Sequence, residues 1–76
     1  MKNKLKECLQ TDLFYVNVGL TDETDPKRRG EICWNARQRA LGMMDMAQHF
    51  GVSFEDAEQL FNQHCKELEV LEYGIL

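Results

Sequence analysis

The amino-acid sequence predicts a small, mostly α-helical domain whose core is a helical hairpin over residues 30–70. Apolar residues recur at alternating steps of three and four over residues 33–50 and again over 54–71, which is the spacing of one helix face. The stretch 51–53 between them begins with glycine, typical of helix ends, and finishes with serine, typical of helix starts. A chain of 76 residues is one domain.

The segment before the hairpin predicts a short helix followed by one strand. Residues 2–10 carry a small apolar face. Residues 13–20 are rich in aromatic and β-branched residues and precede a cluster of turn formers, which favours a strand and makes a small α+β domain the alternative fold. A lone strand needs a partner. Either residues 69–76 or the same strand of a second copy would supply it, and the sequence leaves open whether 69–76 form a strand or continue a helix.

The first hairpin helix is expected to follow the turn formers. Asp25 and Pro26 are a favourable N-cap and first helical residue. Three basic residues then oppose the helix dipole and Gly30 weakens the run, so we expect the regular helix to begin near Gly30. Its core stripe consists of Cys33, Ala36, Ala40, Met43, Ala47 and Phe50.

The second hairpin helix is expected to start after Ser53, with Asp56 three residues later as a near match to a capping box. We expect His64, on its apolar stripe, to be a hydrogen-bonded residue at the edge of the seam. Small residues of the first helix would let Phe54 and Phe61 approach closely. The full stripe is Phe54, Ala57, Phe61, His64, Leu68 and Leu71.

Composition and charge exclude several classes of function. Thirteen acidic residues against nine basic ones give a net charge of −4, which disfavours broad adhesion to nucleic acid or to anionic membranes. No apolar stretch approaches the roughly 20 residues of a membrane helix, and the basic start lacks the apolar core of a signal peptide. Three cysteines without close spacing indicate reduced thiols and a cytoplasmic protein (Cys8, Cys33 and Cys65).

Residues 43–62 resemble a DNA-binding helix-turn-helix. Ala47 matches the small residue that lets the two helices cross, and Gly51 matches the glycine of the turn. The resemblance implies a tight helix corner and, as an alternative function, a small DNA-binding transcriptional regulator. The family reads the major groove with donors of the second helix, whereas this helix begins with carboxylates. DNA would therefore have to be approached through the basic residues Lys27, Arg28, Arg29, Arg37 and Arg39.

No pattern in the sequence indicates catalysis. The cysteines and histidines lack the close pairing of structural zinc sites, so we expect no metal and no cofactor. A Cys–His pair without an oxyanion site or a phosphate-binding loop does not indicate an enzyme.

The sequence therefore favours a non-catalytic accessory or regulatory protein that binds another protein, of a kind common in bacteria and their phages. The first hairpin helix carries a second apolar stripe that would be left in water unless the N-terminal strand, a partner or a second copy in a homodimer covered it. The second helix offers an acidic surface instead. We expect the partner to be bound by Trp34, Leu41 and Met44 or by Glu55, Asp56 and Glu58.

Overall fold

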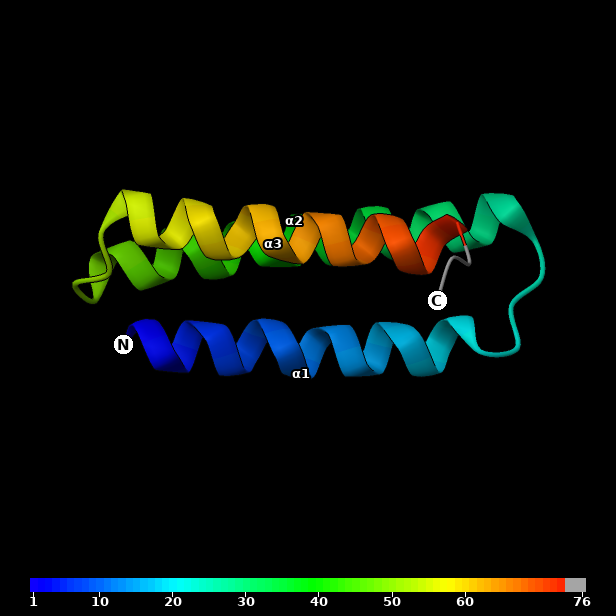
Figure 1. Ribbon diagram of the computed structural model, residues 1–76, viewed down its shortest axis with the longest axis horizontal. Coiled ribbons are helices and arrows are strands. Elements are labelled where there is room, and N and C mark those ends of the chain that lie inside the picture. Colours follow the sequence, from blue (N-terminus) through cyan, green and yellow to red (C-terminus); the bar gives the residue numbers. More distant parts are fainter. Residues whose placement is uncertain (74–76) are drawn as a thin grey trace.

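The structure, a computed structural model, describes residues 1–73, and these form three α-helices. They are α1 (Lys2–Leu20), α2 (Pro26–His49) and α3 (Phe54–Tyr73). Consecutive helices are antiparallel and lie along the length of a rod of 40 × 17 × 16 Å. Each helix packs against the other two (Figure 1). The mostly helical fold and the hairpin of α2 and α3 are confirmed.

Helix α1 takes the place of the strand predicted for residues 13–20. One apolar stripe at helical spacing runs through the whole segment, with Leu5, Leu9, Val16 and Leu20 buried. The strand prediction is wrong because burying this stripe in the bundle outweighs the local β preference of the segment. Its predicted partner, residues 69–76, is helical as far as residue 73, and residues 74–76 lie outside the described part of the chain.

Helix α2 begins at Pro26, earlier than the start expected near Gly30. The side chain of Asp25 caps it by accepting a hydrogen bond from the backbone N–H of Lys27 at 3.1 Å. Basic residues in the first turn of α2 were expected to oppose its dipole. The third of them, Arg29, points to the ends of the other two helices rather than to solvent, which offsets this unfavourable effect.

Arg29 joins the ends of two other helices. Its Nη1 donates to the carbonyl oxygens of Leu20 and Glu23, each at 2.9 Å, beyond the end of α1. Its Nη2 donates to the carbonyl of Leu71 at 2.6 Å and its Nε to that of Glu72 at 3.4 Å, near the end of α3. A guanidinium satisfies helix-terminal carbonyls and interacts favourably with the negative ends of both helix dipoles.

The turn between α2 and α3 has the pattern expected from its glycine. Gly51 adopts a positive φ of 95°, which side chains disfavour. The N–H of Val52 donates to the carbonyl of Ala47 at 3.1 Å, and that of Gly51 to Gln48 at 3.3 Å, which together form a Schellman motif. Val52 is buried in the same cluster as Ala47, so the motif also has its usual apolar contact.

The hairpin of α2 and α3 is long and antiparallel, not a corner. Ser53 Oγ accepts a hydrogen bond from the N–H of Asp56 at 3.2 Å, which confirms Ser53 as the cap of α3. At the far end, Cys33 packs on α3 and its Sγ donates to the carbonyl of Leu68 at 3.7 Å. Helix-turn-helix motifs join their helices at about 90–120°, so the tight corner implied by the resemblance is not formed.

The core divides along the rod into two clusters. The cluster at the hairpin-turn end comprises the buried residues Leu5, Leu9, Ala40, Ala47, Val52 and Ala57. The other comprises Val16, Leu20, Cys33, Ala36, Leu68 and Leu71. Both predicted stripes thus face the core along most of their length, but Phe50 and Phe54 do not, since 60 % and 54 % of their surface is exposed.

Candidate functional site

A polar cluster lies between the two apolar clusters, and all three helices contribute to it. Arg39 Nε donates to Asp12 Oδ1 at 2.8 Å. Nε2 of His64 lies 3.8 Å from Asp12 Oδ2, too far for a hydrogen bond. Only 2 % of His64 and 10 % of the Asp12 side chain are exposed. The cluster therefore joins α1, α2 and α3 at a buried level of the rod.

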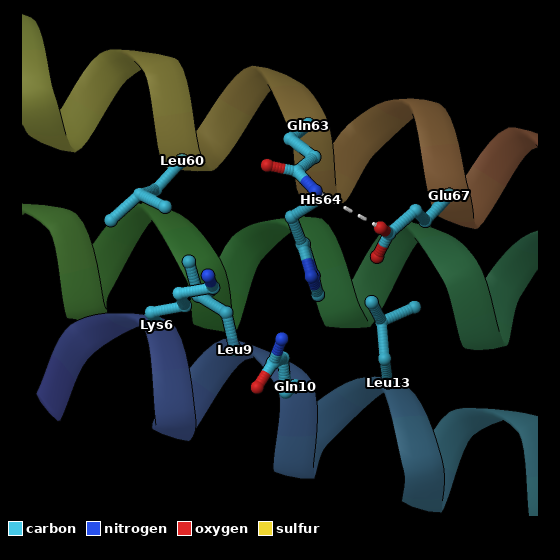
Figure 2. Close-up of a pocket in the computed structure, with 8 residues that line it drawn as sticks. All are labelled: Lys6, Leu9, Gln10, Leu13, Leu60, Gln63, His64 and Glu67. Atoms are coloured by element: carbon cyan, nitrogen blue, oxygen red, sulfur yellow. Dashed lines mark hydrogen bonds between the residues drawn. The ribbon is translucent and has the colours of Figure 1, made fainter. Parts of the chain in front are cut away.

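A small cavity adjoins this cluster between α1 and α3 (Figure 2). The ring of His64 points from α3 toward α1, and beside it Gln63 donates a hydrogen bond to Glu67 at 3.4 Å. The volume of about 30 Å³ holds about one water molecule and is far below that of a ligand pocket. Its lining consists of Lys6, Leu9, Gln10, Leu13, Leu60, Gln63, His64 and Glu67.

Burial lowers the pKa of His64 below its ordinary value of 6.5. The carboxylates of Asp12 and Glu67 favour the charged form, but burial has the largest effect. Neither ring nitrogen has a hydrogen bond of good geometry within the described residues, although the nearby backbone of Ala36 also favours the charged form. The prediction that His64 lies at the edge of the seam is wrong, since its ring is buried at the centre of the bundle.

The three cysteines are free thiols in different surroundings. Cys33 is buried, and burial raises the pKa of its thiol. Cys8 is exposed on α1 and Cys65 is half-buried on α3. Within residues 1–73, no three potential metal ligands come together.

The five basic residues predicted for the alternative function, nucleic-acid binding, differ in their contacts and exposure. Arg29 and Arg39 make the internal contacts described above, and Nη2 of Arg37 lies 3.9 Å from a carboxylate oxygen of α3. Lys27 and Arg28 are exposed at the start of α2. Three of the five thus have contacts within the bundle, whereas the other two are exposed at the surface.

The apolar stripe predicted to bind a partner lies on α2 and is open in part. Trp34 is 58 % exposed and Leu41 38 %, whereas Met44 is half-buried and packs against the core. The predicted strand does not cover them, because that segment is part of α1.

The predicted acidic residues lie in the first two turns of α3, where Glu55 and Glu58 are exposed. Asp56 is half-buried, and its carboxylate lies 3.4 Å from the ammonium of Lys2 on α1. Glu55 and Asp56 also suit the positive end of the helix dipole, which gives them a structural role.

An apolar groove between α1 and α2, which the sequence did not reveal, opens at the hairpin-turn end of the rod. We call it the methionine groove. It has a volume of about 380 Å³, and Met1, Met46 and Phe50 on its walls are more than half exposed. Its lining consists of Met1, which precedes α1, then Lys4, Leu5 and Cys8 of α1, then Gly42, Met43, Met46 and Ala47 of α2, and Phe50, which follows α2.

The sequence pattern placed Met43, Ala47 and Phe50 in the core stripe and left Met46 unassigned. Only the position of α1 beside α2 shows that these residues line a groove. One signal was present: Met43 and Met46 lie one turn apart and flank the same side of α2 as Phe50.

Comparison of the chain with protein-family models, with curated proteins and with solved structures gave no match. Within the described part of the chain, each helix is too short or too polar to cross a lipid bilayer.

Proposed function

We propose that this protein is a non-catalytic accessory protein that binds a helix of another protein in the methionine groove. The observation that carries the proposal is the groove itself, an apolar surface with one charged residue, Lys4, among nine lining residues. Grooves between helices commonly bind the apolar face of an amphipathic helix. Methionine side chains are flexible and polarisable, so they adapt to different partner surfaces.

Two further features favour contact over chemistry. His64 is a buried polar side chain at the centre of the bundle, but the cavity beside it holds about one water molecule and has no room for a substrate. The exposed thiol, Cys8, lines an apolar groove in which Lys4 is the only other polar side chain. Nucleophilic catalysis by a thiol commonly uses a general base beside it, and no histidine or carboxylate is among the described residues that line this groove.

DNA binding, the alternative, has less support. A polyanion requires several free cations on one surface. Arg29 and Arg39 are engaged in the bundle, and the start of α3 presents the carboxylates of Glu55 and Glu58. A specific contact through Lys27 and Arg28 would show as binding that weakens steeply with salt.

Affinity capture with two matched variants tests the proposal. Met46→Lys places a charge in the methionine groove, and Leu41→Lys places the same charge on the predicted Trp34 stripe. We expect a partner retained by the wild type and by Leu41→Lys to be lost from Met46→Lys, with both variants keeping the helical circular dichroism of the wild type. Loss from Leu41→Lys alone would move the contact to the Trp34 stripe.

A further inference from the structure

The length of the methionine groove limits what can occupy it. On α2 it extends from Gly42 to Phe50, which at 1.5 Å per residue is about 12 Å, and on α1 it extends over a similar distance from Met1 to Cys8. Two turns of helix have this length. Such a segment presents apolar side chains at positions i, i+3 or i+4, and i+7 on one face.

The same length argues against a second copy of the chain as the occupant. A strip about 12 Å long and about 10 Å wide, the diameter of a helix, covers on the order of 100 Å². A stable protein interface buries about 800 Å² on each partner, and the rod is 40 Å long. The groove therefore suits a short segment better than the side of another rod.

The charge of the groove indicates which side chains flank the occupant's apolar face. Among the described residues that line the groove, Lys4 is the only one with a charged side chain. Its ammonium lies 3.9 Å from a carboxylate oxygen of Glu7, and about 70 % of both side chains is exposed (72 % and 68 %). An exposed pair of this kind contributes little, so Lys4 can turn to a carboxylate of a bound segment.

Gly42 leaves room for the occupant's backbone to come close to α2. It lies in the interior of the helix, where glycine is among the least favourable residues. A Cβ atom built at Gly42 would meet nothing within 4 Å, so no contact inside the chain requires glycine there. The open space over Gly42 lets a second helix approach more closely than any side chain would allow.

We infer that the methionine groove binds a two-turn amphipathic helix with acidic residues flanking its apolar face, one of them paired with Lys4. The inference rests on the proposed function and specifies the chemistry of the partner. The apolar anchors lie against Met43 and Met46, and the helix backbone passes over Gly42.

Two synthetic peptides test this with no knowledge of the natural partner. Both are 14-residue, alanine-based helices with Leu at positions 4, 8 and 11. One carries Glu at the three positions flanking the leucines, and the other carries Lys there. Each is titrated into the full chain with ¹³C-labelled methionine methyl groups. Met43 and Met46 report on the groove, while Met44, outside it, is an internal control.

We expect the Glu peptide to shift the Met43 and Met46 signals saturably, with an affinity about two- to fivefold above that of the Lys peptide. Lys4→Glu should reverse the preference. Gly42→Ala should weaken binding of the Glu peptide several-fold, whereas Gly19→Ala, at another open helical glycine, should not.

Three results would overturn the inference. Equal binding of the two peptides would remove the acidic specificity. Shifts confined to Met44, or none at all, would remove the groove. Shifts that grow with protein concentration in the absence of peptide would identify a second copy as the occupant. If Met46→Lys still abolishes capture of a natural partner in any of these cases, the proposed function stands and only the chemistry assigned to the partner fails.

Discussion

Nε2 of His64 lies 3.8 Å from Oδ2 of Asp12 at the buried centre of the bundle, and no hydrogen bond joins them. The carboxylate hydrogen-bonds Arg39 through its other oxygen. Burial thus disfavours the charged form of the imidazole, beside a carboxylate that already has a cationic partner. This arrangement makes the stability of the fold depend on pH.

We expect the free energy of unfolding to fall on acidification. Burial lowers the pKa of His64 in the folded state, so the unfolded chain binds more protons below about pH 6.5. The stability is therefore fully present above that pH and is lost as the pH falls toward the folded-state pKa. Urea denaturation at several pH values between about 7 and 5.5 should record this progressive loss.

Two histidine variants identify the residue responsible for this loss. His64→Leu should flatten the profile over that range, because the titrating group is gone. His49→Gln, at an exposed histidine, should keep the slope of the wild type. An unchanged slope in His64→Leu would assign the acid sensitivity to other groups.

We expect Arg29 to contribute more to the free energy of unfolding than the other charged residues near the surface. It satisfies carbonyls near the ends of α1 and α3, and hydrogen bonds to charged groups contribute about 1.5–3 kcal/mol. Arg29→Ala should lower the unfolding free energy by about 2–4 kcal/mol, whereas the matched change at exposed Arg28 should stay within about 0.5 kcal/mol. Equal effects of the two substitutions would show that the hydrogen bonds of Arg29 to these carbonyls contribute nothing to stability.

Gly42→Ala is expected to stabilise the free protein. Alanine is about 1 kcal/mol better than glycine in a helix interior, and the added methyl meets open space. Thermal and urea unfolding should both record the gain. If the Gly42→Ala variant is more stable and also binds the Glu peptide more weakly, then glycine at this position favours binding at the expense of stability. A destabilised variant would reveal a contact with this position that the structure does not contain.

The thiols should react in the order of their exposure. Cys8 should be alkylated first and Cys65 more slowly. Cys33 is buried and burial raises its pKa, so its modification should follow global unfolding. Mass spectrometry of timed samples checks the order. Rapid labelling of Cys33 in native conditions would mean that α2 and α3 separate far more readily than their packing indicates.

The hairpin could be predicted from sequence because its signals are local and agree with each other. Ser53 and Gly51 mark the two helix ends, and the small residues of α2 stand at regular helical spacing. The first helix was predicted only over residues 2–10, because Asp12 occupies the centre of its apolar stripe, where a polar residue hides the periodicity. Asp12 is tolerated there only because Arg39, 27 residues away in sequence, reaches it.

The methionine groove could not be predicted for a related reason. It exists only when Leu5 and Cys8 lie beside Met43 and Met46, and that neighbourhood depends on α1 being one continuous helix. The predicted sites at Trp34 and at the start of α3 were chosen from single helices. Their role as contacts stays a prediction, which the Leu41→Lys variant tests directly.

Site-specific photo-crosslinking in cells tests the central claim most directly. A benzoylphenylalanine at position 46 places the probe in the methionine groove, and the same residue at position 34 places it on the other exposed stripe. We predict that position 46 crosslinks one reproducible partner, at a helical segment with acidic flanks, and that position 34 does not. Crosslinks to that partner from position 34 alone, or from position 46 only to a second copy of this chain, would contradict the account.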